Sequence, residues 1–152
     1  MKKQQITTPE FSRPLLVDRV PRKGSHEVIK AEPSELAALK QRFLLAGLHS
    51  LNCRFLVTPW RGGGVKVTGT VEADVEQVSI VSLEAFRQLA KFEVLRYFLP
   101  AGEVDEAEEI DADPIHNGEI DLGEIAAETL GLELDPYPRK PGEAFEPSPA
   151  ET

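Results

Sequence analysis

The sequence has little of what several protein classes require. Cysteine occurs once, at Cys53, so the chain can form neither a disulfide scaffold nor a paired-cysteine metal site. No run of eighteen apolar residues is present, which excludes a membrane-spanning helix. The basic start Met1–Gln5 is followed by threonine, proline and arginine instead of an apolar stretch, so we expect no secretory signal. Together these absences predict a cytoplasmic protein.

Basic residues are scarce in the C-terminal third of the chain. Residues 101–152 hold 2 Lys and Arg against 16 Asp and Glu, a net charge of −14. Residues 1–100 hold 15 against 10, a net charge of +5. The formal charge of −9 is therefore an average over two unlike parts, and it excludes neither nucleic acid nor a basic protein as a partner.

Composition also suggests the domain organisation. We expect a flexible arm over residues 1–10, one domain over residues 11–142 and a disordered, proline-rich tail over residues 143–152. Inside the domain, residues 103–119 are expected to form an acidic loop. Residues 103–113 contain seven carboxylates and no basic residue. Such a segment can bury too little apolar surface to become ordered.

Alternation of apolar and polar residues predicts β-structure in the middle of the chain. The odd positions from His49 to Val57 form one apolar face, and a second alternating strand runs from Val65 to Glu76. The Gly-rich loop 60–64 between them predicts an antiparallel hairpin. Shorter strands are expected over residues 27–29, 78–83 and 92–99.

Two helices are predicted by their end signals. The first begins at Pro33 and is closed by Gly47, and the second is capped by Asp121 and ended by Gly131. Glu124 lies three residues after Asp121, which is the spacing of a capping box. The predicted fold class is therefore α+β: a mainly antiparallel β-sheet, with barrel-like closure left open, and two short helices.

Several sequence blocks resemble a known family. They are Phe11-Ser12-Arg13-Pro14, Ala31–Leu36, Gly69–Gln77, Val81–Glu84, Ile120–Glu124 and Asp135–Gly142. In their order and spacing the chain resembles the YceD-like large ribosomal RNA subunit accumulation proteins of bacteria, in the form found in alphaproteobacteria. The resemblance implies a non-catalytic cytoplasmic factor needed for normal accumulation of large-subunit ribosomal RNA.

This chain departs from the family pattern at two places. Family members often have a cysteine where this chain has Ser79, and some relatives end in a cysteine-rich tail where this chain has Pro136-Tyr137-Pro138-Arg139. A metal or redox role carried by those cysteines is therefore not expected here.

Seven residues are candidates for partner binding. Trp60 beside Arg61 is suited to stacking on an unpaired RNA base. The other five lie in the family-like blocks: Arg13, Asp121, Glu124, Tyr137 and Arg139. A structural role is the alternative for several of them, because Asp121 and Glu124 fit a helix cap and Tyr137 fits packing of the tail.

Other kinds of site have less support in the sequence. Asp113 to Glu124 has the spacing of an EF-hand loop, but Ile115 stands where calcium needs an oxygen ligand. The loop 60–66 resembles a phosphate cradle but lacks its Gly-Lys-Ser/Thr ending. No nucleophile and base stand at catalytic spacing, so we expect no enzyme activity, no cofactor and no metal.

The leading hypothesis is a ribosome-biogenesis factor that binds large-subunit ribosomal RNA, a basic ribosomal protein, or both. The acidic segment would repel RNA but attract a basic protein. The alternatives are a general acidic adaptor with no ribosomal role and, less favoured, a small enzyme. The sequence does not indicate the oligomeric state.

Overall fold

The protein is described here by a computed structural model, which covers residues 9–102 and 111–142. The strands are β1 (Pro14–Leu16), β2 (Ser25–Lys30), β3 (Gly47–Trp60), β4 (Gly64–Val78), β5 (Ala85–Pro100), β6 (Ala112–Ile115) and β7 (Glu119–Asp121). The helices are α1 (Pro33–Arg42) and α2 (Leu122–Glu133), with 3-10 turns η1 (Val17–Arg19) and η2 (Arg61–Gly63).

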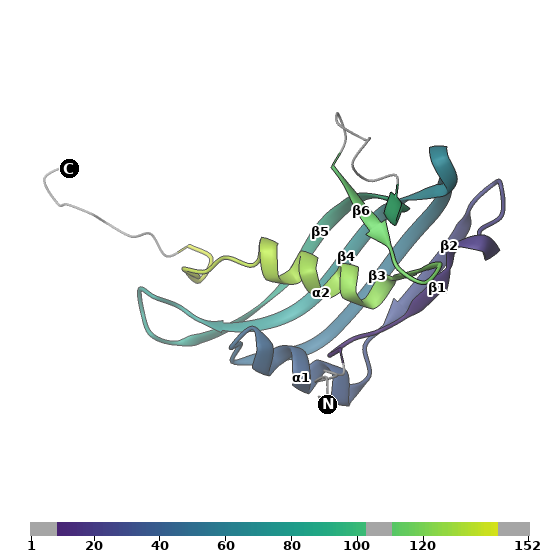
Figure 1. Cartoon of the computed structure of the whole chain (residues 1–152). Helices are drawn as coiled ribbons and strands as arrows, with labels where there is room; N and C mark the ends of the chain where they lie inside the picture. The colour runs from purple at the N-terminus through teal and green to yellow at the C-terminus, as the bar shows by residue number, and fades with distance from the viewer. Residues whose placement is uncertain (1–8, 103–110, 143–152) are drawn as a thin grey trace, which may run out of the picture.

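A five-stranded sheet in the order β2-β3-β4-β5-β6 forms the body of the molecule (Figure 1). Its neighbouring strands run antiparallel except β5 and β6, which are parallel, and β1 pairs with β7 in a separate two-stranded sheet. The predicted fold class, α+β with a mainly antiparallel sheet and two helices, is confirmed. The sheet of the described residues is open, since β2 and β6 stand at its two edges.

The core lies on one face of the sheet because β3 and β4 alternate in the predicted way. Leu51, Cys53, Phe55 and Val57 of β3 are buried. They face helix residues such as Leu39, Leu122 and Leu130, and the partners Val67, Val71 and Val75 of β4 lie on the same buried side. His49 does not belong to this face, contrary to the prediction. The pairing of β3 with β4 shifts by one residue between Leu48 and Ser50, and this bulge turns His49 outward beside Glu76.

The strand predicted over residues 78–83 is wrong beyond Val78, which ends β4, because residues 79–84 form the turn between β4 and β5. The hydroxyl of Ser79 accepts hydrogen bonds from the backbone N–H groups of Val81 and Ser82, and Ser79 N donates to the carbonyl of Glu84. Leu83 has a φ of 63°, which a strand does not allow. The strand predicted over residues 92–99 is part of the longer β5.

The two glycines expected to end the helices have other roles. Helix α1 ends at Arg42, followed by Leu44 with a φ of 55°, and Gly47 is the first residue of β3. Gly131 lies inside α2, where a Cβ would stand 2.7 Å from Cε1 of Phe43. A glycine there therefore allows α2 to pack closely against Phe43.

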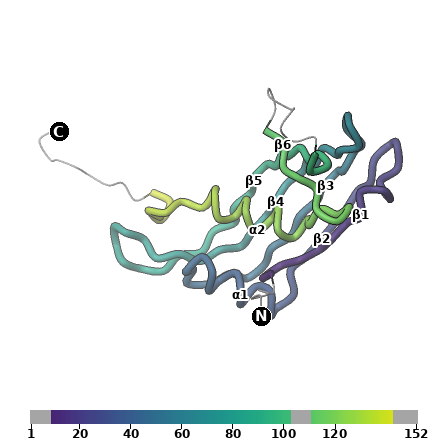
Figure 2. Tube along the Cα trace, in the orientation of Figure 1, coloured from purple at the N-terminus to yellow at the C-terminus, as the bar shows by residue number. Residues whose placement is uncertain are grey.

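Part of the expected acidic loop lies outside the described residues, namely 103–110. Of the remainder, residues 112–115 form strand β6 beside β5, and a turn at Asn117 and Gly118 leads to β7. Figure 2 shows this region beside the N-terminal segment, in agreement with the pairing of β1 and β7. No helix among the described residues is long and apolar enough to cross a membrane.

The close approach of β3 and β4 at Gly69 gives a test of the fold. A Cβ at this residue would stand 2.0 Å from the backbone oxygen of Arg54, and Gly69 has a φ of 155°. We expect Gly69→Ala to lower the free energy of unfolding by about 1–3 kcal/mol, measured by urea denaturation. Gly102→Ala is the control, since no atom lies within 4 Å of its Cβ position. Equal stability of the two variants would contradict the register described here.

Candidate nucleic-acid interface

Arg13 ties the N-terminal segment to helix α1. Its guanidinium donates to both carboxylate oxygens of Glu35, at 2.7 and 2.9 Å, and to the backbone oxygen of Lys30 at 2.9 Å. It also lies 4.8 Å from the ring centre of Phe11, which is completely buried. The Glu35 carboxylate in turn accepts from the backbone N–H of Glu32, which begins α1. Arg13 is therefore fully engaged inside the molecule.

Asp121 ties the same segment to helix α2. Its Oδ1 accepts from the backbone N–H groups of Gly123 and Glu124, so the predicted cap is confirmed. The same carboxylate accepts from the backbone N–H of Arg13 at 2.7 Å and from the Ser12 hydroxyl at 2.6 Å. Asp121 thus caps the N-terminus of α2 and also binds residues 12–13.

Glu124 does not complete the predicted capping box. Its carboxylate lies 3.9 Å from Arg42 Nη2 and close to Glu128. Burial is the main cause of a raised pKa for Glu124, and the neighbouring Glu128 raises it further. The structural alternative stated for Asp121 therefore fits, whereas Glu124 lies in a carboxylate-rich region of α2.

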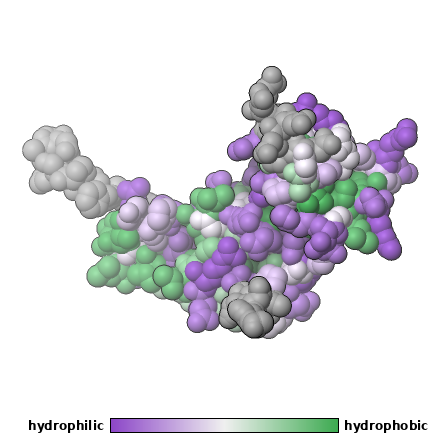
Figure 3. All heavy atoms as spheres, in the orientation of Figure 1, coloured by the Kyte–Doolittle hydropathy of each residue, from purple (hydrophilic) through white to green (hydrophobic). Residues whose placement is uncertain are grey.

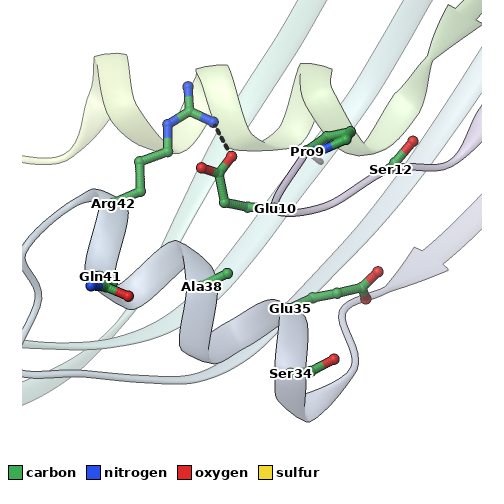
Figure 4. Close-up of a pocket in the computed structure, with 8 residues that line it drawn as sticks. All are labelled: Pro9, Glu10, Ser12, Ser34, Glu35, Ala38, Gln41 and Arg42. Carbon is green, nitrogen blue, oxygen red and sulfur yellow. Dashed lines mark hydrogen bonds and ion pairs between the residues drawn. The ribbon is translucent and has the colours of Figure 1, made fainter. Parts of the chain in front are cut away.

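The grooves on the helix side are lined by charges that are already paired. One of about 820 Å³ lies between residues 9–12 and α1, and the ion pair of Glu10 and Arg42, 2.9 Å, crosses it (Figure 4). In another, Arg96 Nη2 lies 2.7 Å from Asp113 and 3.1 Å from Glu128. The described part of the chain contains no group of His, Cys, Asp and Glu able to hold a metal ion.

Cys53 is placed where it cannot act as a nucleophile. It is 1% exposed in the middle of β3, and burial raises the pKa of its thiol to about 12. At neutral pH the side chain is an uncharged thiol that packs in the core.

The other face of the sheet is open. Both helices pack on the buried face, and the side chains that point away from it are exposed or half-buried in β2, β3, β4 and β5. We call this surface the open face. Its members are His26, Val28, Lys30, Asn52, Arg54, Leu56, Thr58, Trp60, Lys66, Thr68, Thr70, Glu72, Asp74, Arg87, Leu89, Lys91, Glu93, Leu95 and Tyr97.

One end of the open face carries an aromatic and basic cluster. The rings of Trp60 and Tyr97 are 4.6 Å apart, and the guanidinium of Arg61 lies 4.6 Å from the Trp60 ring centre. Lys66 is the direct cross-strand partner of Tyr97. Trp60 and Tyr97 are both half-buried, and Arg61 is exposed. Two neighbouring aromatic rings, tilted by 45° to each other, are therefore partly presented to solvent beside cations.

Several basic residues on or beside the open face have no ion-pair partner among the described residues. Arg13, Arg42, Arg87 and Arg96 each form an ion pair with a carboxylate. By contrast, Arg54, Arg61 and Lys66 form no salt bridge with any residue that the structure describes. At the other end of the open face, Arg87 pairs with Asp74 and Lys91 with Glu72. Two of these free positive charges, Arg61 and Lys66, lie beside the aromatic rings.

Tyr137 and Arg139 lie far along the chain from this cluster, next to the turn between β4 and β5. The backbone N–H of Ile80 donates to the carbonyl of Pro138 at 2.9 Å, and the amide of Gln77 donates to the carbonyl of Asp135. Tyr137 is 67% exposed and Arg139 is exposed. In Figure 3 apolar atoms gather at this hairpin end, where Val78, Ile80, Val81 and Leu83 are exposed.

The seven predicted site residues lie in three places. The structure brings Arg13 and Asp121 together, with Glu124 in the first turn of α2 capped by Asp121. It also brings Trp60 and Arg61 together, but it leaves Tyr137 and Arg139 apart from both groups. Sequence reasoning missed Tyr97, and it did not join Arg54 and Lys66 to Trp60. The alternation of side chains in β5 indicates that Tyr97 lies on the open face. Only the register between β4 and β5 places it beside Trp60.

The fold and its surface define a class: an α+β protein with helices on one side of an open sheet and an aromatic, basic surface on the other. Residues 67–152 match the family described as large ribosomal RNA subunit accumulation protein YceD. The match covers more than half of the chain, and the chain belongs to this family. No curated protein and no solved structure was found to match.

The contact of Arg13 with Glu35 predicts a pH dependence of stability. The hydrogen bond from Arg13 holds the pKa of Glu35 below its usual value of 4.5. Its stabilisation is therefore complete above pH 4.5 and disappears as the pH falls through the lowered pKa. We expect Glu35→Gln to lower the free energy of unfolding by about 1–2 kcal/mol at pH 7, and by progressively less below pH 4.5. Urea titrations between pH 3 and 7 measure the difference in unfolding free energy between Glu35→Gln and the unmodified protein. If this difference does not change with pH, the prediction is contradicted.

Proposed function

We propose that this protein supports accumulation of large-subunit ribosomal RNA without catalysing a reaction, by binding an unpaired segment of that RNA on the open face. The family relates the chain to accumulation of this RNA. The observation that carries the binding proposal is the row Arg61, Trp60 and Tyr97 on an uncovered sheet surface. The site of action is then the cytoplasm, where ribosomal RNA is made.

The chemistry of this surface fits single-stranded RNA. Every base has an aromatic face, so bases stack on Trp and Tyr rings and on guanidinium groups with little dependence on sequence. Arg54, Arg61 and Lys66 are free to contact phosphates because no carboxylate in the described structure neutralises them. Thr58, Thr68 and Thr70 lie on the same surface, and their hydroxyl groups can donate to and accept from ribose.

Local charge favours RNA on this surface despite the net charge of −9. Most of the carboxylates lie after residue 100, and those of the described C-terminal part follow β6, β7 and α2 on the other side of the sheet. On the open face, Glu72 and Asp74 are paired with Lys91 and Arg87, whereas Glu93 has no salt bridge among the described residues. The unpaired cations Arg54, Arg61 and Lys66 outnumber it. A purely acidic adaptor would not need an aromatic surface with unpaired cations.

Removing the central ring tests the stacking surface. We expect Trp60→Ala to weaken binding of a labelled ten-nucleotide oligoadenylate by about 1–3 kcal/mol, because one stacked base loses its platform. Fluorescence anisotropy at low salt measures the affinity. Trp60→Phe keeps a ring and retains most of the binding. Trp60 is the only tryptophan, so its fluorescence in the unmodified protein reports the same contact directly.

Charge neutralisation separates phosphate contacts from general attraction. Arg61→Gln is expected to reduce the slope of log affinity against log salt by about 0.7, since one phosphate contact is lost. Lys40→Gln, on α1 at the other side of the sheet, removes the same charge and leaves the slope unchanged. Equal effects of the two variants would show that RNA does not bind on the open face.

The same residues should matter in the cell. In cells depleted of this protein, we expect the unmodified chain to restore the ratio of large- to small-subunit ribosomal RNA. Trp60→Ala combined with Arg61→Ala should fail, whereas Lys40→Gln should succeed at equal protein levels on an immunoblot. Full restoration of the ratio by the double variant would contradict binding of RNA on the open face. It would do so even if depletion of the protein does change the ratio.

A further inference from the structure

The outer edge of strand β5 is unpaired along most of its length. β5 pairs with β4 from Ala85 to Phe98 without interruption, but on its other side β6 pairs only with Tyr97–Pro100. Within residues 9–102 and 111–142, no strand pairs with the outer edge of residues 85–96. A row of backbone donors and acceptors is therefore exposed over twelve residues, which is a template for an added strand.

Two features that normally protect such an edge, proline and a β-bulge, are absent here. Residues 85–96 contain no proline, and their pairing with β4 shows no bulge. Of the four charged side chains in this segment, Arg87 pairs with Asp74 and Lys91 with Glu72 of β4, and Arg96 pairs with Asp113. Glu93 forms no salt bridge with a described residue, and its negative charge favours a basic strand over an acidic one. At the same time Leu89 is 82% and Leu95 is 59% exposed. The edge is thus both unpaired and partly apolar.

A groove continues from this edge toward helix α2. It has a volume of about 560 Å³ and is lined on the β5 side by Leu95 and Arg96 and on the helix side by Glu128, Gly131 and Leu132. Leu132 is 82% exposed. Side chains of an extended peptide alternate between two faces, so one set would meet Leu89 and Leu95 and the other set would meet Leu132.

The charge around the groove defines the occupant. α2 contains Glu124, Glu128 and Glu133 and no basic residue, and Asp111 and Asp113 line the same groove. Arg96 and Arg42 also line the groove, and Arg96 contacts Asp113 and Glu128. The five carboxylates still outnumber these two arginines, so the region keeps an excess of negative charge. The chain's own segments 103–110 and 143–152 hold five and three carboxylates and no basic residue, so they carry none of the positive charge that the groove favours. A second copy carries the same net charge of −9, which disfavours it at this acidic groove.

We propose that the β5 edge binds an extended basic peptide segment of a partner protein by strand addition, with small apolar residues between its cations. This inference extends the proposed function, since it gives a basic protein partner the outer edge of β5, which adjoins the RNA surface at Leu95. The backbone of β5 supplies hydrogen bonds, Leu89, Leu95 and Leu132 supply apolar contacts, and the carboxylates of α2 select positive charge.

The probe is the nine-residue peptide Lys-Val-Lys-Thr-Lys-Val-Lys-Thr-Lys, titrated into the full chain by calorimetry. Two versions N-methylated at alternate residues, in opposite phase, remove the hydrogen bonds on one side or the other. We expect one phase to bind at least roughly tenfold more weakly and the other to bind normally. Equal binding of both phases would mean simple charge attraction and would overturn the proposal.

Charge reversal provides the matched control. Glu128→Lys should abolish binding of the probe, whereas Asp18→Lys, in η1, changes the charge equally and should not. A peptide with glutamate in place of lysine should not bind. If light scattering shows that the free protein is a dimer, a second copy occupies the β5 edge, and this result would overturn the proposal. Oligoadenylate binding measured on the same Glu128→Lys protein should be unchanged, which separates this surface from the RNA surface.

Discussion

The packing of the whole molecule depends on the short segment Phe11–Arg13. Phe11 fills the core, the Arg13 side chain holds Glu35 at the start of α1, and the Arg13 backbone and the Ser12 hydroxyl bind Asp121 at the start of α2. Three residues thus fix two helix N-termini on the same face of the sheet. Because both helices are held there, the opposite face remains uncovered, and this leaves Trp60 and Tyr97 available to a partner.

The two faces of the sheet also differ in how their basic side chains are paired. Arginines on the helix side are neutralised by nearby carboxylates, so their role is to hold the fold together. On or beside the open face, Arg54, Arg61 and Lys66 have no such partner among the described residues. Two unlike partners, a polyanion at the aromatic end of the open face and a basic peptide at the edge of β5, can therefore bind to neighbouring parts of one small chain.

Much of the fold could be predicted from local patterns, because period-two alternation in β3 and β4 and the cap at Asp121 depend on neighbouring residues only. The errors arose where tertiary contacts decide. Gly131, which lies inside α2, packs against Phe43 at the end of α1. A bulge in β3 turns His49 outward. Residues 78–83 are apolar enough for a strand, but the Ser79 hydroxyl stabilises a turn. Trp60 and Arg61 were found as a pair, whereas Tyr97 needed the register of β4 with β5.

The most direct measurement is hydroxyl-radical footprinting of the protein with and without bound single-stranded RNA, read by mass spectrometry. Three aromatic residues serve as internal reporters: Trp60 and Tyr97 on the open face, and Tyr137, which is 67% exposed, beside the hairpin turn. The account predicts that RNA lowers the reactivity of Trp60 and Tyr97 and leaves Tyr137 unchanged. Protection of Tyr137 with unchanged Trp60 and Tyr97 would contradict it.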